Sequence, residues 1–554
     1  MADWSLKGIE STASLKVGDK RELEVEGIDD AKVLLVNAAG GVYATGPKCT
    51  HYGAPLVKGV VTANGRITCP WHGACFNAKT GDVEDAPALD CLATFKVTER
   101  DGRVYISGDR DVIKAGRRKP NFKLTGAKDD RSKVVVVGGG SGAIGAVEAL
   151  REKGFAGSIT VVSAEGYLPI DRPKLSKALI ADPAKVQLRD QAWFDAGGVA
   201  FVHDEATGVD FASKAVHTKQ HGDLPYTKLI LATGGTPRNL PLQGFKVLGN
   251  VFTLRNVVDV QHIVGALQAG GEGAAQAKKK IVIVGSSFIG MEVANATAKS
   301  HDVTVVGMEK VPLERVLGLD VGAAAQRGLE KNGVRFYMAA AVDKAEPSAA
   351  DPAKVGAVRL KDGTRLEADL VVLGVGVAPA TEYLRDNKVV RLEADGSLKT
   401  DETFAVVGLK DVYAVGDIAT FPYHGPGADG KAVRIEHWNV AQKAGRIAAQ
   451  HIVNPGLPAG KAAYFTPVFW SALASQLRYC GNTAASGWDD VVVQGSFEEG
   501  SWAAFYTKGE IVVAVATTNR DPVMSQSAEL MGAGKMPSKS QLASGLDVLT
   551  LGPP

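Results

Sequence analysis

The sequence has no strong excess of charge and no long apolar run, and these two absences exclude whole classes of function. The chain has 554 residues, with 63 Lys and Arg against 61 Asp and Glu, which leaves a formal net charge of +2. Such a small excess provides no electrostatic attraction to nucleic acid or to an anionic membrane, so we expect neither partner. Because no stretch of about 18 uninterrupted apolar residues occurs, we also expect no transmembrane segment.

Cysteine is scarce as well. Five cysteines over this length cannot form the dense disulfide framework of a small secreted protein. The first residues, MADWSLKGIESTASLKVGDK, have neither the apolar core of a secretory signal nor the Arg-rich, acid-poor composition of a transit segment. We therefore expect a reducing, cytoplasmic setting, and an association with mitochondria stays open.

Two mixed pairs of cysteine and histidine lie close together in the first quarter of the chain. One residue separates Cys49 from His51, and two residues separate Cys69 from His72. In a [2Fe–2S] cluster of the Rieske type, thiolates hold one iron and imidazoles hold the other. A zinc site is the alternative, but its usual spacing pairs cysteine with cysteine and histidine with histidine. The pattern resembles the Rieske family and predicts these four residues as ligands of a [2Fe–2S] cluster.

The positions beside these ligands indicate which kind of Rieske centre this is. High-potential members of the family carry disulfide cysteines where this chain has Ala54 and Trp71, and cluster-bonding hydroxyls where it has Ala74 and Phe76. Hydrogen bonds to the cluster sulfurs stabilise the reduced, more negative state, so their loss lowers the reduction potential. The resemblance therefore implies a ferredoxin-type centre with a potential of roughly −150 mV.

A glycine-rich turn follows a run of valines at about residue 138. In KVVVVGGGSGAIGAVEALREKG, the G-x-G-x-x-G/A positions are Gly138, Gly140 and Ala143. They allow a tight turn, close approach of the backbone to a pyrophosphate, and close packing of helix on strand. Glu165 ends the next predicted strand, where it can accept a hydrogen bond from a ribose hydroxyl. A flexible glycine loop is the alternative, but strand, helix and terminal acid together favour a dinucleotide-binding fold.

A second copy of this pattern lies further along, in KKIVIVGSSFIGMEVANATAKSHDVTVVGME. Gly285, Ser287 and Gly290 occupy its turn positions, and Glu309 is its late acidic residue. Two copies in one chain resemble the two-dinucleotide flavoprotein reductases, which bind FAD in the first and NAD(P) in the second. Further marks of that family follow in order: ATGGTPR with Thr233 and Gly234, GVGVAP with Gly376, and DVYAVGDIA with Gly416 and Asp417. The resemblance implies that Asp417 holds a ribityl hydroxyl of FAD.

Three further segments indicate the branch of this family. No redox-active cysteine pair follows the first strand, whereas YLPIDRPKLSK, VRIEHWNVAQKAGRIAA and YFTPVFWSALASQLRYCG resemble the ferredoxin-reductase and apoptosis-inducing-factor branch. The resemblance implies that Arg172 and Lys177 contact the flavin and that Lys177 holds Glu436. It also places four side chains near the isoalloxazine: Glu436, His437, Trp438 and Trp470. Ordinary core packing remains the alternative for the aromatic residues.

The predicted fold is multidomain: an N-terminal all-β Rieske domain, an α/β flavoprotein with two dinucleotide-binding domains, and an α+β C-terminal interface domain. The order resembles the Rieske-bearing branch of the apoptosis-inducing-factor family, and the final thirty or so residues match it least well. We expect these segments: a Rieske domain at 1–108, a charged, aperiodic linker at 109–132, an FAD domain at 133–260 and 401–463, an NAD(H) domain at 261–400, and the interface domain at 464–554.

The predicted function is electron transfer from NADH through FAD to the cluster, with Lys177, Glu436 and Trp470 as the candidate catalytic residues. NADH is favoured over NADPH because no arginine adjoins Glu309 in the sequence, although Lys310 is close. The final acceptor stays open among an oxygenase, a haem protein, a quinone and dioxygen, and the chain can be a monomer or a homodimer. The alternative is a signalling protein whose NADH-bound state recruits a partner.

Overall fold

The Rieske domain is built from two antiparallel sheets. The computed structural model describes residues 2–122, 129–268, 278–456 and 465–553. The larger sheet has the order β1 (Ala2–Ser5), β11 (Arg103–Gly108), β10 (Thr94–Arg100), β4 (Gly41–Thr45), β3 (Lys32–Ala38), β2 (Lys20–Glu24). The smaller sheet has the order β5 (Val60–Val61), β6 (Arg66–Thr68), β7 (Cys75–Asn77), β8 (Val83–Asp85).

Strand β3 fills two hydrophobic cores because successive side chains of a strand point to opposite faces. Val33 and Leu35 pack into the core of the larger sheet. Leu34 and Val36 pack on the other side, in the core that contains Cys49 and other residues of the two ligand loops. The all-β prediction for this domain is therefore confirmed.

The first part of the segment 109–132, which the sequence predicts as an aperiodic linker, forms a short helix and a strand. Asp109 caps α1 (Arg110–Ala115) by accepting from two backbone N–H groups, Ile113 anchors the helix, and Gly116 ends it at φ 62°. Strand β12 (Arg117–Arg118) then pairs with β9 (Cys91–Leu92). This short helix was not foreseen, because only one of its residues is buried and it has no apolar periodicity. Residues 123–128 of the expected linker lie outside the described residues.

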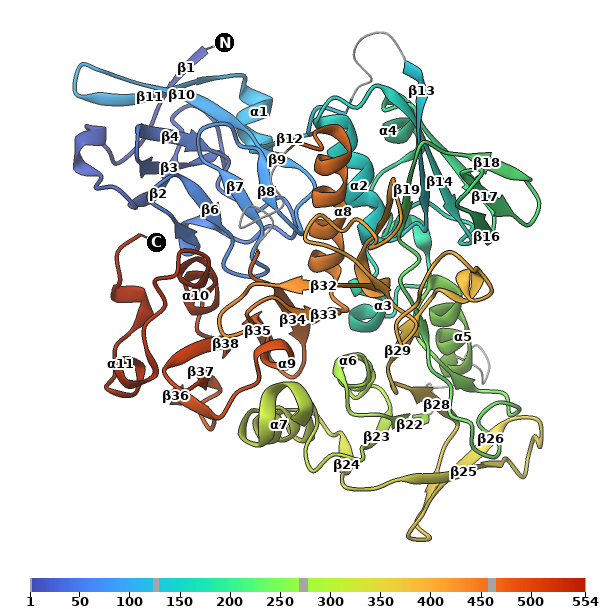
Figure 1. Cartoon of the computed structure of the whole chain (residues 1–554). Helices are drawn as coiled ribbons and strands as arrows, with labels where there is room; N and C mark the ends of the chain where they lie inside the picture. Colours follow the sequence, from blue (N-terminus) through green and yellow to red (C-terminus); the bar gives the residue numbers. More distant parts are fainter. Residues whose placement is uncertain (1, 123–128, 269–277, 457–464, 554) are drawn as a thin grey trace.

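The first dinucleotide-binding domain has a parallel sheet with the order β15 (Val199–His203), β14 (Gly157–Ser163), β13 (Asp129–Val137), β19 (Lys228–Leu231), β31 (Val412–Ala414). Helix α2 (Ser141–Glu152) packs along α8 (Trp438–Val453), a segment almost 300 residues away in the chain (Figure 1). Glycine makes this contact possible, since a Cβ on Gly445 would lie 2.1 Å from the Gly142 carbonyl oxygen. The domain also contains α3 (Pro173–Ala178), α4 (Gln191–Ala196), β16 (Ala206–Asp210), β17 (Ala215–Thr218) and β18 (Asp223–Pro225).

The second dinucleotide-binding domain repeats this plan. Its parallel sheet has the order β21 (Val251–Phe252), β28 (Leu370–Leu373), β22 (Lys280–Val284), β23 (Asp302–Val306), β24 (Arg335–Tyr337). Its helices are α5 (Val257–Gln268), α6 (Phe288–Thr297) and α7 (Glu314–Lys331), and a small antiparallel sheet follows with β25 (Val342–Pro347), β26 (Val355–Leu360) and β27 (Arg365–Glu367).

The strand pairing places the boundaries of this domain at other residues than the sequence predicts. Strand β21, before the expected boundary at 260, belongs to the second sheet, and β20 (Gly235–Pro237) pairs with β29 (Val377–Pro379) as a two-stranded connection between the domains. Strand β30 (Leu398–Lys399) lies before the expected boundary at 400 but pairs with β32 (Ala419–Tyr423), which also pairs with β33 (Lys431–Val433). These edges depend on long-range pairing, which local patterns do not report. The expected boundary at 463 lies outside the described residues.

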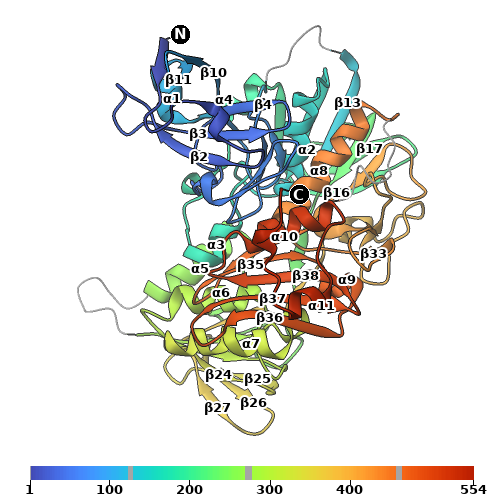
Figure 2. The ribbon, with the colours of Figure 1, turned by 90° about the vertical axis from the view of Figure 1, so that its left-hand side faces the viewer.

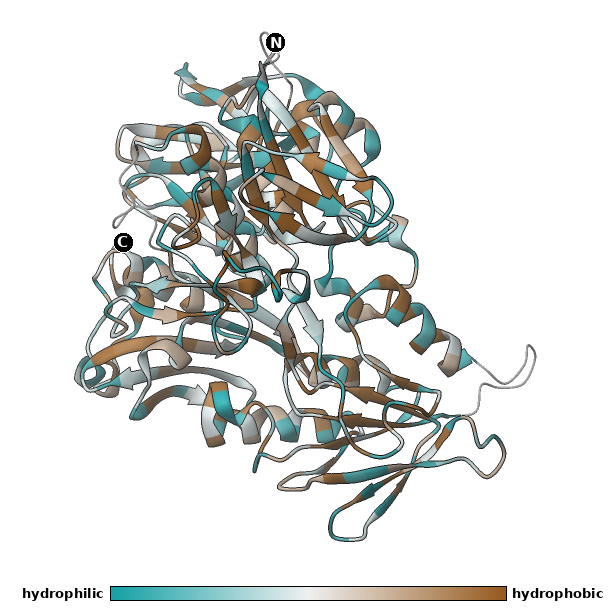
Figure 3. Ribbon diagram, turned by 45° about the vertical axis from the view of Figure 1, so that its right-hand side comes forward, coloured by the Kyte–Doolittle hydropathy of each residue, from teal (hydrophilic) through white to brown (hydrophobic). Residues whose placement is uncertain are grey.

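The C-terminal domain is an antiparallel sheet with the order β34 (Val468–Ala472), β35 (Gln476–Gly481), β38 (Ile511–Thr518), β37 (Ser501–Lys508), β36 (Asp490–Ser496). With α9 (Thr483–Ser486), α10 (Val523–Gly532) and α11 (Lys539–Ala543) it confirms the α+β prediction. Helix α10 lies between this sheet and the Rieske domain (Figures 1 and 2). Apolar residues concentrate on the sheet strands in Figure 3. No helix in the described ranges has the length and apolar character needed to cross a membrane.

Candidate active site and cluster centre

A cavity of about 990 Å³ is lined by both dinucleotide-binding domains and the C-terminal domain. It brings together most of the side chains and turns that the sequence predicts to bind cofactor: Gly138, Gly140, Glu165, Arg172, Lys177, Thr233, Gly234, Ser287, Gly376, Gly416, Asp417, Glu436, His437, Trp438 and Trp470. Four predicted residues are not in its lining: Ala143, Gly285, Gly290 and Glu309.

The first glycine-rich turn has the geometry of a phosphate-binding site. Gly138 has a φ of 113°, and a Cβ there would lie 2.2 Å from the carbonyl oxygen of Ala232. A Cβ on Gly140 would meet no protein atom within 4 Å, so this position leaves space at the cavity wall. No side chain caps the N-terminus of α2 at Gly140, and exposed helix N–H groups attract phosphate. Ala143 is buried in α2, where it packs rather than lines the cavity.

The second turn has the same packing requirements. A Cβ on Gly285, at φ 107°, would lie 2.3 Å from the Gly374 carbonyl oxygen, and one on Gly290 would lie 2.5 Å from that of Gly285. These two glycines allow strand and helix to approach, while Ser287 lines the cavity and donates to the Gly374 carbonyl at 2.9 Å.

Glu165 and Arg172 face each other at the cavity wall. The guanidinium donates to both carboxylate oxygens, at 2.9 and 2.8 Å. Burial opposes ionisation of Glu165, but the charge and hydrogen bonds of Arg172, together with Tyr167 and Arg255, outweigh it and lower the pKa of the carboxyl group. A ribose hydroxyl would therefore share this carboxylate with Arg172, a pairing that the sequence did not reveal.

Asp417 has a partner that sequence reasoning missed. The Arg255 guanidinium donates to its carboxylate at 2.8 Å, and both residues line the cavity. Arg255 lies in the connection between β21 and α5, where no motif marks it. The pair puts a positive and a negative group on one wall of the cavity.

The predicted pairing of Lys177 with Glu436 is wrong. Lys177 in α3 lies 2.9 Å from Glu292 in α6, whose other donors include the Ser471 hydroxyl at 2.7 Å. Glu436 instead pairs with Arg434 at 2.5 Å, and burial raises its pKa despite that guanidinium. The packing of α3 against α6 selects the partner, and the sequence hint was an acidic residue in the helix after the second glycine turn.

The surroundings of Glu309 also differ from the expectation. Arg315, at the start of α7, lies 3.0 Å from the Glu309 carboxylate, which also accepts from the Ser286 hydroxyl at 3.1 Å. Arg315 does not adjoin Glu309 in the sequence, since it lies six positions further along. The Arg315 side chain is 77% exposed, so this ion pair lies at the protein surface.

Two of the described residues that line the cavity carry buried polar atoms without partners, which fits a polar, hydrogen-bonding cofactor. Among the described residues, the buried His437 Nδ1 and Asn439 Oδ1 have no hydrogen-bond partner, and both residues line the cavity. Burial lowers the pKa of His437 to about 4, so its ring is neutral. Since buried polar atoms without partners are costly, a flavin with ring and ribityl hydrogen-bonding groups is a suitable occupant.

The four predicted cluster ligands meet in two pairs, imidazole with imidazole and thiol with thiol. His51 Nδ1 and His72 Nδ1 lie 3.0 Å apart. Burial lowers the pKa of His51 to about 3 and that of His72 to about 2, so both rings are neutral. Neutral imidazole is the form that binds metal.

The two thiols form the other half of the centre. Cys49 donates to Cys69, and this contact and burial raise the pKa of Cys49. Burial opposes ionisation of Cys69, but its pKa falls because Cys49 and the backbone N–H groups of His72 and Trp71 donate to it. One pair of sulfurs and one pair of ring nitrogens match the donor set of a Rieske cluster.

Trp470 connects the cluster ligands to the cavity. Its ring centroid lies 4.2 Å from that of His72 and 5.6 Å from that of His51, and it also lines the cavity. The same ring therefore contacts a ligand of the predicted cluster on one side and the predicted flavin site on the other.

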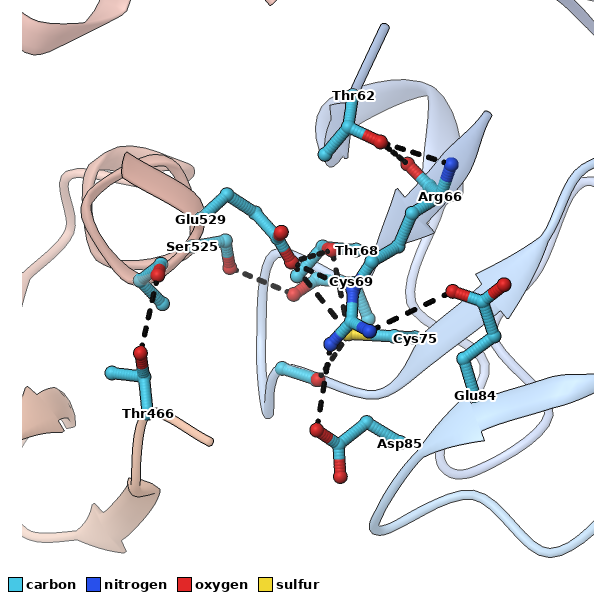
Figure 4. Close-up of polar contacts among 12 residues, drawn as sticks. Thr62, Arg66, Thr68, Cys69, Cys75, Glu84, Asp85, Thr466, Ser525 and Glu529 are labelled. Atoms are coloured by element: carbon cyan, nitrogen blue, oxygen red, sulfur yellow. Dashed lines mark hydrogen bonds and ion pairs between the residues drawn. The ribbon is translucent and has the colours of Figure 1, made fainter. Parts of the chain in front are cut away.

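Helix α10 of the C-terminal domain holds the ligand loop (Figure 4). The Ser525 hydroxyl donates to the Cys69 carbonyl oxygen at 2.8 Å, and both residues are buried. One turn further on, Glu529 pairs with Arg66 at 3.1 Å and accepts from Thr68 at 2.5 Å. A strand and a loop of the Rieske domain are thus hydrogen-bonded to the reductase.

Comparison with known families decides the class. The family model described as pyridine nucleotide-disulphide oxidoreductase matches residues 132–445, more than half of the chain. The chain belongs to this family. The Rieske [2Fe-2S] domain matches residues 8–96 and the reductase C-terminal domain matches residues 468–548. The protein is thus a Rieske-bearing flavoprotein oxidoreductase of the pyridine nucleotide-disulphide family, which uses FAD and a nicotinamide cofactor.

Individual relatives match most of the chain. Apoptosis-inducing factor 3 of Homo sapiens is 38% identical over 95% of this chain and 84% of its own length. Putidaredoxin reductase of Pseudomonas putida is 32% identical over 72% of this chain and 91% of its own length. The crystal structure of a covalent putidaredoxin reductase–putidaredoxin complex has a TM-score of 0.67 at 29% identity and covers 75% of this chain and 96% of that chain.

Proposed function

We propose that this oxidoreductase passes electrons from NADH through FAD to its own Rieske cluster and on to a separate one-electron acceptor. The position of Trp470, between the cavity and His72, is the observation that supports this most. When bound, FAD would take two electrons from the nicotinamide and release them singly. In the ferredoxin-reductase relatives, the acceptor is a separate protein; here the fused Rieske domain would take its place.

The residues of the chain bind and orient rather than exchange protons in this proposal. The N-terminus of α2 and Gly140 hold the pyrophosphate, while Asp417 and Arg255 hold polar groups of the ribityl chain. Lys177, fixed by Glu292, keeps a positive charge at the cavity wall, where it favours a more negative, reduced cofactor. Glu436 also lines the cavity and pairs with Arg434.

NADH is the proposed donor because the Glu309 carboxylate would repel a 2′-phosphate. Arg315 acts in the opposite sense, so the preference is the balance of these two charges. The cysteines are all free and buried, which favours a reducing compartment such as the cytoplasm. Both the cavity and the cluster ligands come from one chain, so the proposed route is complete in a monomer and is kept in a homodimer.

The cluster surroundings favour a low reduction potential. Ala74 and Phe76 are completely buried and offer no hydroxyl to the cluster sulfurs. We propose a potential near the low end of the Rieske range, roughly −150 mV. Such a centre suits an oxygenase, a haem protein, a quinone or dioxygen as the final acceptor.

Rapid anaerobic mixing with NADH tests the proposal. The purified protein should contain about two irons per chain, as a [2Fe–2S] cluster requires, and show a Rieske-type EPR signal after reduction. Flavin absorbance should fall before cluster absorbance. Cluster reduction that persists after FAD is removed, or that comes first, would contradict the route.

The similarity to apoptosis-inducing factor 3 keeps a signalling role as the second candidate. A signalling protein would hold its reduced flavin for a long time, with a cluster that stays oxidised. Slow flavin reduction and an unreduced cluster in the same experiment would favour it.

A further inference from the structure

The reductase places a buried arginine beside the ligand loop of the Rieske domain. Arg478 in β35 is the direct cross-strand neighbour of Trp470 in β34. Side chains directly opposite each other in an antiparallel pair lie on the same face of the sheet. Arg478 therefore faces the same side as Trp470, whose ring contacts His72.

The packing of this face against the ligand loop is tight. Val468, two residues before Trp470, lies so close to Gly73 that a Cβ on that glycine would approach its side chain to 3.0 Å. Gly73 directly follows His72. Sheet and ligand loop are thus in direct contact, with no room for a layer of side chains or water at this point.

The charge of Arg478 is fixed in place. Its guanidinium donates to both carboxylate oxygens of Asp521, at 2.6 and 2.8 Å, and its side chain is 9% exposed while that of Asp521 is 27% exposed. Arg478 therefore presents its charge on the sheet face that carries Trp470 and Val468, and these two residues touch His72 and Gly73 of the ligand loop.

We propose that Arg478 and Asp521 together set the reduction potential of the cluster from outside the Rieske domain. Reduction adds one negative charge to the cluster, so a nearby cation stabilises the reduced state and raises the potential. The Asp521 carboxylate offsets part of that effect. This assignment rests on the proposed function only in that the four ligands hold a [2Fe–2S] cluster, and it does not require NADH to be the donor.

Substitutions of the two residues should shift the potential in opposite directions. In Arg478→Met the midpoint potential should fall, and in Asp521→Asn it should rise. A roughly tenfold change in the one-electron equilibrium is expected for loss of a buried charge beside the cluster, which is about 59 mV for a one-electron couple. Arg478→Lys, which keeps the charge, should shift it much less.

An EPR-monitored redox titration of the full-length protein with all cofactors, using dithionite and mediators, measures this directly. Arg103 and Glu26 supply the matched control, because this pair is also Arg–carboxylate, at 3.5 Å, but is 60% and 43% exposed. Arg103→Met and Glu26→Gln should leave the potential unchanged.

Opposite shifts in the two variants, with a normal EPR line shape, would support the proposal. Potential shifts of the same sign in the two variants would overturn the proposal, because a merely structural pair would disturb the cluster in the same way in each variant. An unchanged potential with intact cluster content would overturn it as well. If Arg478→Met does not fold, the other two variants decide. A higher midpoint potential in Asp521→Asn with little change in Arg478→Lys supports the proposal, and any other result overturns it. Failure of NADH to reduce the cluster in the wild type would contradict the proposed function and leave this titration unaffected.

Discussion

At the scale of single residues, ion pairs decide what the cavity can do. Lys177, Asp417 and Glu309 each have a partner that lies far along the chain or on another element: Glu292, Arg255 and Arg315 respectively. Charge-assisted contacts are roughly twice as strong as neutral hydrogen bonds. Each partner therefore competes with the cofactor for the charged group that the sequence predicts to bind it.

Lys177 and Glu292 should act as a unit in flavin reduction. Lys177→Ala should slow NADH-dependent flavin reduction by about tenfold or more, because removing an electrostatic stabiliser costs rate, while FAD content stays high. Glu292→Gln keeps the serine contacts but removes the carboxylate that holds Lys177, so the rate of flavin reduction should fall by a similar factor. Anaerobic stopped-flow at the flavin wavelength measures both, and a larger effect from Glu436→Gln than from Glu292→Gln would argue for the other pairing.

The preference between NADH and NADPH should depend on two opposing side chains. Glu309→Ala should raise kcat/KM for NADPH by about tenfold, because one repulsive contact is worth about 1.4 kcal/mol. Arg315→Ala should lower the remaining NADPH activity and leave NADH nearly unchanged. Steady-state kinetics with both nucleotides in both variants tests this, and equal changes for the two nucleotides would show that neither residue reads the 2′ position.

At the scale of elements, α10 joins the C-terminal domain to the Rieske ligand loop. Successive turns of this helix present Ser525 to the Cys69 carbonyl and Glu529 to Arg66 and Thr68. Residues four apart lie on the same face of a helix, so one face of α10 makes both contacts. This face keeps the ligand loop next to Trp470.

Loss of these contacts should slow transfer into the cluster more than transfer into the flavin. Ser525→Ala leaves a buried carbonyl unpaired, which costs about 1–3 kcal/mol of stability. The rate of cluster reduction should fall by about tenfold, because a small misplacement of the ligand loop relative to Trp470 would slow electron transfer. Ser540→Ala in α11, an exposed serine that bonds Glu510, is the control. Equal slowing of the flavin and cluster phases would count against the role given to α10.

At the scale of the whole molecule, a buried ion network fastens the Rieske domain to the FAD domain. Arg189 lies 2.5 Å from Asp90 of the Rieske domain and 3.0 Å from Glu148 in α2. Burial opposes ionisation of Asp90, but Arg189 and Arg117 outweigh it and lower the pKa of the carboxyl group. The two domains are therefore coupled by charge as well as by α10.

Removing Arg189 should destabilise the whole protein. Arg189→Met leaves Glu148 without its ion-pair partner and leaves Asp90 with Arg117 alone, and breaking a buried pair costs about 3–5 kcal/mol. Calorimetry should show a lower Tm, or a separate Rieske transition. The exposed Arg103→Met variant should melt like the wild type.

The same contact predicts the direction of acid sensitivity. A carboxyl group whose pKa is lowered on folding adds stability that is complete above its unfolded value, here 3.8, and lost as the pH falls through the folded value. Asp90→Asn should thus be less stable than the wild type at neutral pH, with the difference shrinking below about pH 4. A difference that grew on acidification would contradict the assignment.

What the sequence determined by itself is local. The spacing of Cys49, His51, Cys69 and His72 indicates the cluster, because ligands on short loops must lie close together whatever surrounds them. The glycine turns at Gly138 and Gly285 indicate the two dinucleotide folds, because only glycine accepts those backbone angles with a carbonyl 2.2–2.3 Å from a would-be Cβ. The order of these motifs was enough for the fold class.

The contacts between distant groups became visible only in the folded chain. Glu292 lies 115 positions from Lys177 but pairs with it. Arg478 shares a sheet face with Trp470, which packs against His72 more than 390 positions away. Helix α1 and strand β12 extend the Rieske domain into the expected linker. Such contacts follow from how helices and sheets pack, and packing depends on shape complementarity across the whole chain. Local sequence patterns do not report such packing. The chemistry of the two centres could therefore be predicted from the sequence, whereas the connection between them, through Trp470 to His72, could not.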